Sequence, residues 1–399
     1  MKTATLFCFI TMAPYLTMGC NVDVLTSSDD EVNIPQIVNE NLSALIPQIK
    51  AHQSESSVSF VYISDLHNQV HTGTYSFANE NIQKIQRLVM AVNEINKKVG
   101  LCCVVLGGDY LWNTTHTTKT AAIEALTDFC QAMTRINDLP ILCLKGNHDD
   151  NSLAGVQNTL TQEEYYDICA TSFISNNIVT DSSNPSGCYG YFDCLSQKTR
   201  FLYINSVDLP WIEIEGDLKY KIQWQKGIRQ PQLDFIAKAL TFEEKGWGVI
   251  FISHHSVKSI VGYDTSSDSY ITPANGGDQL YGIIKAYKNG SIYYGRSNGD
   301  FESQVAVDYS TNKDSELICL LNGHIHCDRN AIYDGMLFCS TTSATLGNGK
   351  SYNTNNSIYN PTSNTVNETA FDVITVDRKI GTVYFDRFGF GESREFRYK

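Results

Sequence analysis

Short clusters of aspartate, histidine and asparagine recur along the chain, each directly after an apolar run. The clusters are SDLH (64–67), GGD (107–109), GNHD (146–149), SHH (253–255) and GHIH (323–326). They contain six of the nine histidines of the chain. Carboxylates, imidazoles and an amide oxygen suit divalent cations such as zinc, manganese or iron, whereas a thiolate-rich set would indicate a softer metal. These residue types predict a metal site that carries out hydrolysis.

The spacing within the clusters indicates how the side chains would share cations. Residues i and i+2 of an extended segment project from the same face, so Asp65 and His67 are expected to hold one cation together. The same argument applies to His324 and His326. Asp109 stands alone between these pairs, which suits a carboxylate that bridges two cations about 3.5–4 Å apart. Glycines beside the ligands let the backbone turn sharply there.

The elements that position these clusters follow from the apolar pattern. The apolar runs cover residues 58–63, 101–106, 141–144, 201–204, 249–252 and 317–321. None of them alternates cleanly with polar residues, which is typical of strands buried on both faces. Apolar residues recur every three or four positions within 79–98, 121–136 and 232–240, and this spacing predicts helices. An α/β fold results, with ligands beyond the carboxyl ends of the strands.

In their order and local spelling, the five clusters resemble the calcineurin-like metallophosphoesterase family. That family has the pattern D-x-H, G-D, G-N-H-[DE], a downstream H, and G-H-x-H, and the resemblance spans about residues 59–327. It implies a four-layer αββα sandwich, in which two mixed β-sheets are flanked by helices. It also implies a metal-dependent phosphoesterase with two divalent metal ions, which are manganese, zinc, iron or cobalt.

The resemblance gives each motif residue a role. One metal ion takes Asp65, His67 and His326, the other takes Asn147, His254 and His324, and Asp109 bridges the two. His254 is preferred to His255, although a one-residue bulge would reverse that choice. His148 is left without a metal. In the family this histidine contacts the phosphate and stabilises the transition state or protonates the leaving group, and Asp149 is a candidate to orient its ring.

The implied reaction is attack of a metal-activated hydroxide on a phosphodiester or phosphomonoester, with diesters slightly favoured. The substrate is expected to be a small molecule or a lipid head group. An alternative is a non-catalytic glycan- or ligand-binding envelope lipoprotein on the same fold. A formal net charge of −13 argues against stable nucleic-acid binding.

The first residues indicate export. Residues 1–19 contain Lys2 and an apolar stretch too short to span a bilayer, and they resemble a bacterial lipoprotein signal peptide that ends before Cys20. Lipidation of Cys20 would anchor the protein to the cell envelope, on the periplasmic side or at the surface, and no other membrane attachment is expected. Residues 20–56 are predicted to be an N-terminal tether, and their acidic stretch reads as a flexible spacer.

Residues 57–399 are predicted to form a single domain with insertions near 150–200 and 256–316. The second insertion contains Tyr281, Tyr287 and Arg296, which could stack on a ring and bind a second phosphate, or form a self-packed cap. Residues 340–368 read as an extended surface loop. The alternating pattern of 371–388 predicts a β-hairpin that completes a sheet edge.

A few further residues carry weaker expectations. Cys188 and Cys194 are the best disulfide candidates, whereas the cysteines within apolar runs are expected to be core residues. Tyr110, Trp112 and Asn113 follow the second cluster and either wall the pocket or pack. His71 and His116 are more simply solvated loop residues than substrate ligands, and His52 is given no function.

Overall fold

The computed structural model describes residues 34–399 except 70–76, 176, 261–262, 264–265, 267–268, 313, 346–358 and 360. Residues Pro35–Lys399 form one compact unit. The predicted signal peptide and Cys20 lie outside the described residues, as does His71. None of the helices in the described part has the length and apolar character that a membrane crossing requires.

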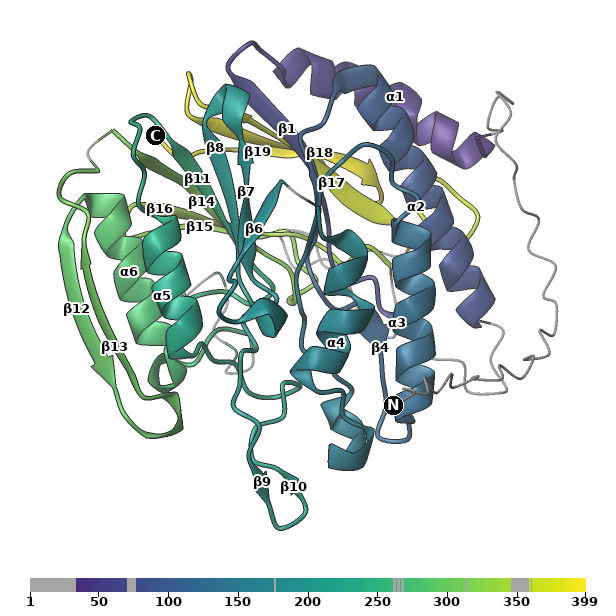
Figure 1. Ribbon diagram of the computed structural model, residues 1–399. Coiled ribbons are helices and arrows are strands. Elements are labelled where there is room, and N and C mark those ends of the chain that lie inside the picture. Colours follow the sequence, from purple (N-terminus) through teal and green to yellow (C-terminus); the bar gives the residue numbers. More distant parts are fainter. Residues whose placement is uncertain are drawn as a thin grey trace, which may run out of the picture. The chain divides into compact units, whose positions relative to one another are not determined.

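The first of two large sheets has six strands in the order β19-β18-β17-β1-β3-β5 (Figure 1). Its strands are β1 (Ser57–Ile63), β3 (Val104–Leu106), β5 (Ile141–Cys143), β17 (Ala370–Asp377), β18 (Thr382–Gly389) and β19 (Arg394–Arg397). β1, β3 and β5 run parallel, and β17 pairs antiparallel with β1. The predicted C-terminal hairpin is present as β17 and β18, but β19 forms the sheet edge beyond it.

The second sheet has seven strands in the order β15-β16-β14-β11-β8-β7-β6. They are β6 (Ile178–Thr180), β7 (Gly190–Cys194), β8 (Thr199–Tyr203), β11 (Gly248–Ser253), β14 (Glu316–Asn322), β15 (Asn330–Tyr333) and β16 (Met336–Ser340). β8, β11, β14 and β16 run parallel, while β6, β7 and β15 pair antiparallel with their neighbours. Both sheets are therefore mixed, as predicted.

The two sheets pack face to face through their inner side chains. Phe60 of β1 meets Phe201 of β8 with ring centroids 4.9 Å apart, and Ile250 of β11 belongs to the same buried cluster. Every residue of β1 is buried, so both of its faces are covered. This double burial explains why the apolar runs in the sequence lack alternation.

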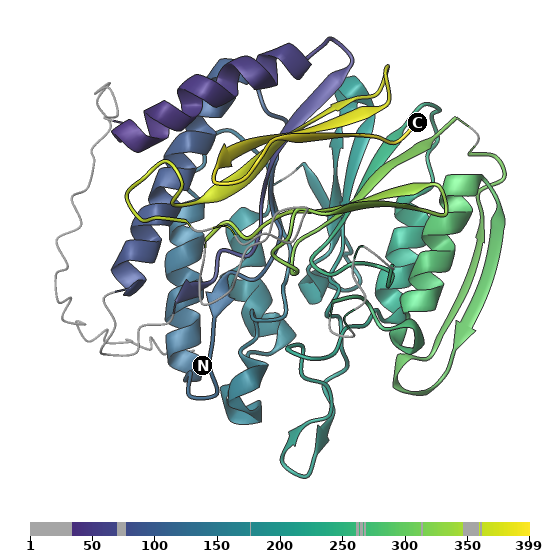
Figure 2. The same ribbon diagram turned by 180° about the vertical axis from the view of Figure 1, so that it is seen from behind.

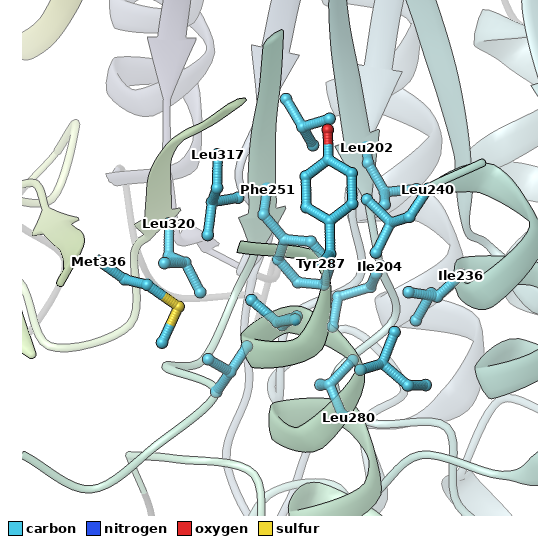
Figure 3. Packing of buried hydrophobic residues seen from close by; sticks show 14 of the residues in the cluster. Leu202, Ile204, Ile236, Leu240, Phe251, Leu280, Tyr287, Leu317, Leu320 and Met336 are labelled. Atoms are coloured by element: carbon cyan, nitrogen blue, oxygen red, sulfur yellow. The ribbon is translucent and has the colours of Figure 1, made fainter. Parts of the chain in front are cut away.

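Helices form the two outer layers (Figures 1 and 2). The helices are α1 (Gln36–His52), α2 (Phe77–Val99), α3 (Lys119–Met133), α4 (Gln162–Ile168), α5 (Gln230–Ala239) and α6 (Gly277–Asn289). α1 lies against β17 and β18 and beside α2, which also contacts α3. On the second sheet, Ile236 of α5 and Leu280 of α6 pack with Leu202 and Phe251 (Figure 3). This arrangement is the predicted four-layer αββα sandwich.

Three small two-stranded pairs complete the described elements. They are β2 (Asn68–Gln69) with β4 (Leu111–Trp112), β9 (Glu213–Ile214) with β10 (Asp217–Leu218), and β12 (Ile292–Ser297) with β13 (Ser303–Asp308). The parallel strands β1, β3, β5, β11 and β14 all deliver their carboxyl ends to the loops that carry the metal-ligand clusters.

The predicted tether does not extend as far as residue 56. Residues 36–52 form helix α1, which buries Val38, Leu42, Leu45 and Ile49 at spacings of four, three and four residues. His52 at its end pairs with Asp386, with 3.0 Å between His52 Nδ1 and Asp386 Oδ2. The tether prediction is therefore wrong for this stretch, because the helix has an apolar face that packs on the first sheet.

The second insertion forms part of the outer layer on the second sheet. It contains α6 and the β12–β13 pair, with Tyr287 in the hydrophobic core and the Tyr281 hydroxyl donating to Asp334 Oδ2 at 2.9 Å. These contacts match the self-packed cap, which was one of the two alternatives, and Tyr287 lies in the core instead of at a ligand ring.

Two other expectations need correction. Cys188 and Cys194 are both free, and the Cys188 thiol lies 3.1 Å from Gln162 Nε2 instead. The predicted surface loop at 340–368 begins with buried residues: Thr341 to Thr345 are all nine-tenths or more buried, and Ser343 Oγ donates to the Asp65 carbonyl at 2.7 Å. The middle of that segment lies outside the described residues.

Candidate active site

The loops after the parallel strands hold the ligand residues in a strained backbone conformation. Asp65, His67, Asp109, His324 and His326 have φ values of 58°, 45°, 57°, 67° and 49°. Such left-handed conformations cost roughly 1–3 kcal/mol each in residues other than glycine, and they concentrate at functional sites. The extended geometry expected for the Asp-x-His and His-x-His pairs is therefore wrong. Asp65 and His67 still share a ligand group, whereas His324 and His326 belong to different groups, so the expectation that they hold one cation together is wrong as well.

The first ligand group comprises Asp65, His67 and His326, whose candidate ligand atoms lie within 4.8 Å of one another. His326 Nε2 is 3.0 Å from His67 Nε2 and 3.3 Å from Asp65 Oδ1. Asp65 and His67 are fully buried, whereas His326 is partly exposed. Three candidate ligand atoms that converge at this separation fit a cation.

The second ligand group comprises Asn147, His254, His255 and His324. Asn147 Oδ1 is 3.2 Å from Nε2 of both His254 and His255, and the ligand atoms of the three histidines lie within 4.8 Å of one another. His324 Nδ1 is buried and has no hydrogen-bond partner among the described residues. An orphaned imidazole nitrogen here fits a metal ligand. The geometry brings His255 to the site together with His254.

Asp109 lies between the two groups. Its Oδ2 is 3.3 Å from His254 Nε2, and its carboxylate clusters both with Asp65 and His254 and with His67 and His148. A carboxylate with neighbours on both sides is placed to bridge two cations.

Hydrogen bonds from outside the cluster fix the histidine rings. His254 Nδ1 lies 2.8 Å from the Gly107 carbonyl, which can accept only if Nδ1 carries the hydrogen. His255 Nδ1 lies 2.8 Å from Ser206 Oγ. In a neutral His254 ring, the hydrogen on Nδ1 leaves Nε2 free for a metal, as is usual where an outer partner sets the tautomer of a ligating histidine. Ser206 was not found by sequence reasoning, because nothing near it resembles a motif.

The charges in the cluster favour a ligand set ready for cations. Burial lowers the pKa of His67 to about 3, and burial places the pKa values of His255 and His324 well below the ordinary value, so these rings are neutral. Burial opposes ionisation of Asp109, but the nearby His254 lowers the pKa of Asp109. The Asp109 carboxylate in turn raises the pKa of His254 to about 9. In the metal-free protein the His254 ring is therefore protonated and paired with Asp109, and metal binding would release that proton.

Asp149 supports the loop that carries Asp109. Its buried carboxylate accepts four backbone N–H groups, from Asp109 (3.0 Å), Tyr110 (2.7 Å), Leu111 (3.2 Å) and Gly146 (2.7 Å). Burial and the Asp109 charge raise its pKa to about 7, and the N–H donors oppose that shift. A side chain at Gly146 would overlap Asp109, which explains the glycine. The expectation that Asp149 orients the His148 ring is therefore wrong.

His148 is positioned by residues that follow the second cluster instead. Its Nδ1 lies 2.8 Å from Asn113 Oδ1, and its ring stacks on Trp112 at 5.3 Å between centroids and 19° between planes. Its Nε2 is 4.0 Å from Asp109 Oδ2, beside the candidate metal groups. Trp112 and Asn113 thus contact His148, whereas Tyr110 packs, with its hydroxyl within hydrogen-bonding distance of the carbonyls of Leu106 and Leu144.

One contact to His148 comes from a segment in which the sequence predicted no function. Gln223 Nε2 lies 3.4 Å from His148 Nε2, and Gln223 belongs to the stretch between β8 and α5. The remaining weak candidate within the described residues, His116, lies in an exposed turn and does not join the ligand groups.

Comparisons with known proteins identify the family of this chain. The family model described as calcineurin-like phosphoesterase matches residues 58–328, and the comparison with curated proteins gives no match. Similar solved structures include a phosphopantetheinyl hydrolase from Mycobacterium tuberculosis (11% identity, 73% of this chain and 91% of that chain covered, TM-score 0.34). Another is an NAD nucleotidase from Haemophilus influenzae (14% identity, 86% of this chain and 49% of that chain covered, TM-score 0.35). A third is a 5′-nucleotidase from Candida albicans (15% identity, 74% of this chain and 48% of that chain covered, TM-score 0.38). Because the matched region covers more than half of the chain and contains every ligand cluster, the protein belongs to the calcineurin-like phosphoesterase family.

Proposed function

We propose that this protein is an exported phosphoester hydrolase that works with two divalent metal ions and slightly prefers diesters. The observation that carries the proposal is the convergence of the predicted ligand side chains into two groups that meet at Asp109. Substitution of ligands, as in a purely binding relative, would have broken this convergence.

The proposed metal ligands form two sets that have Asp109 in common. Asp65, His67 and His326 would hold one ion, and Asn147, His324 and one or both of His254 and His255 would hold the other, with Asp109 shared. When bound, such ions supply a hydroxide nucleophile near neutral pH and neutralise charge at phosphorus.

His148 would act on the phosphoryl group or the leaving group. The contact between its Nδ1 and Asn113 Oδ1 fixes Nδ1 as the nitrogen that bears a hydrogen in the neutral ring. Nε2 then faces the ligand groups, where it can receive a proton and pass it to a departing oxygen.

The substrate is proposed to be a small-molecule or head-group phosphoester outside the cytoplasm. Support for export comes from the signal-like residues 1–19, and support for a lipid anchor comes from Cys20. Incorporation of labelled fatty acid into the wild type but not into a Cys20→Ser variant would test the anchor independently of catalysis.

Catalysis is tested with purified protein loaded in turn with manganese, zinc, iron and cobalt. We expect hydrolysis of p-nitrophenyl phosphate and of bis-p-nitrophenyl phosphate, faster for the diester, with about two metal ions per chain. A His148→Ala variant should lose about 10²–10⁴-fold in kcat while keeping its metals. His116→Ala is the matched control, since that histidine is exposed and outside the ligand groups. Absence of turnover with all four metals would contradict the proposal.

A further inference from the structure

Two cysteines from different sheets lie at the end of the sandwich opposite the ligand clusters. Cys102 comes two residues before β3, whose carboxyl end leads to Asp109. Cys194 is the last residue of β7 and pairs with Thr199, the first residue of β8. Since β8 runs parallel to β11, whose carboxyl end leads to His254, Thr199 and Cys194 lie at the amino end of the parallel strands of the second sheet. Both cysteines are therefore remote from the metal ligands.

The thiols of these two cysteines interact with each other. Both side chains pack against the hydrophobic cluster that contains Phe60 and Phe201, and both line one cavity of about 1000 Å³. Hydrogen bonding to Cys102, and burial to a lesser extent, raise the pKa of the Cys194 thiol well above its ordinary range. Burial raises the pKa of the Cys102 thiol in the same direction. Two protonated thiols, one from each sheet, are thus neighbours.

These two side chains are also accessible. Of the ten cysteines in the described part of the chain, only Cys102 and Cys194 are partly exposed, and the other eight are buried. Cys103 lies next to Cys102, with 3.7 Å between the two sulfur atoms, but it is fully buried in the core cluster. Thiol–disulfide exchange requires access of the disulfide donor to the thiol, so it is favoured at the two partly exposed positions.

We propose that Cys102 and Cys194, which are both reduced in this structure, form a disulfide that joins the two sheets in an oxidising compartment. The thiolate of one cysteine attacks a sulfur of a donor disulfide, which gives a mixed disulfide and releases one donor thiol. The other cysteine then attacks the protein sulfur of the mixed disulfide and releases the second donor thiol. Two protein thiols are thereby oxidised, one donor disulfide is reduced, and the protons of the cysteines pass to the two released thiols. The bond closes a loop of roughly 90 residues, and in the chain-entropy model so long a loop gives a large stabilisation.

Oxidation of the purified full chain by oxidised glutathione tests the proposal independently of export. The protein is incubated at about pH 8.5, where more of each thiol is ionised, until the number of free thiols is constant. It is then alkylated, digested and analysed by mass spectrometry. We expect a crosslink between the peptides that contain Cys102 and Cys194, and both Cys102→Ala and Cys194→Ala should abolish it. Cys103→Ala and Cys188→Ala are the matched controls and should keep the crosslink, because each removes a cysteine close in sequence to one member of the pair.

Urea denaturation separates a stabilising disulfide from an incidental crosslink. Reduction of the oxidised wild type should lower its urea midpoint by about 1 M, whereas the same treatment should leave the midpoint of Cys102→Ala unchanged. Free thiols at both positions after oxidation would overturn the proposal, as would a crosslink through Cys103 or Cys188 instead. An oxidised wild type no more stable than the reduced protein would overturn it as well. Neither measurement uses a substrate, so failure of the proposed hydrolysis would not affect this test.

Discussion

Replacement of Asp149 by asparagine is expected to destabilise the protein and to lower its metal content, although Asp149 is not one of the proposed metal ligands. The carboxylate is fully buried, and each of its oxygens accepts two backbone N–H groups. Asparagine keeps one oxygen, but its NH₂ group would face two N–H donors. Those two donors, on either Asp109 and Gly146 or Tyr110 and Leu111, would lose their acceptor.

The magnitude follows from the number of orphaned donors. A buried polar group without a partner costs about 1–3 kcal/mol, so two of them cost about 2–6 kcal/mol of unfolding free energy. Three of the four donors, those of Asp109, Tyr110 and Leu111, belong to the loop that carries Asp109, whose left-handed backbone has a φ of 57°. A shift of that loop would move the bridging carboxylate, so we also expect fewer than two metal ions per chain.

The assay combines urea denaturation of the metal-free protein with metal analysis of the loaded protein. Asp150→Asn is the matched control: it is a neighbouring buried aspartate, and its Oδ1, which accepts from Ser152 N at 2.7 Å, has a counterpart in asparagine. An Asp149→Asn protein that unfolds within about 1 kcal/mol of the wild type and binds two metals would refute the supporting role of this carboxylate.

Other predictions concern the second metal group, the buried ion pairs and helix α1. His254→Ala should lower the metal content more than His255→Ala, because only His254 also contacts Asp109 (3.3 Å). Equal loss of bound metal from the two variants would contradict this prediction and indicate that both histidines are ligands. Asp372→Asn should cost about 3–5 kcal/mol at pH 7, since it breaks a buried pair with Arg387 (2.8 Å). Burial opposes ionisation of Asp372, but Arg387 lowers its pKa, so its stabilising effect is present above the ordinary aspartate pKa of 3.8 and is lost as the pH falls below it. The difference in urea midpoint between wild type and variant should therefore shrink below about pH 4. Leu42→Ala should cost about 2–5 kcal/mol in the same assay, and no loss would show that α1 does not stabilise the domain.

The central strands and three of the helices could be predicted because their signals are local. Residues 58–63 read as a buried strand and appear as β1 (Ser57–Ile63), and the helix predicted at 79–98 is α2 (Phe77–Val99). The apolar spacing of α1 was also present in the sequence, but the acidic stretch before it favoured a continuous tether. Propensity and charge along a segment do not reveal whether a large sheet offers that segment a surface to cover.

The ligand residues could be predicted for a different reason. A metal site requires particular side chains at strand ends, and these residue types can be recognised in the sequence as motifs. Their backbone conformation was not visible: the i and i+2 argument assumed an extended chain, whereas His67 and His326 are left-handed with φ of 45° and 49°. The pairing of Cys188 with Cys194 failed similarly, because nearness in sequence did not bring the two thiols into contact.

The groups that orient the ligands come from parts of the chain where no motif exists. Ser206 reaches the ring of His255, and Gln223 reaches that of His148, from the connection between β8 and α5. Serine and glutamine are ordinary surface residues by type, and only the packing of the two sheets places them at the site. The motif clusters are common to a family, whereas Ser206 and Gln223 contact the site from a connection that carries no motif.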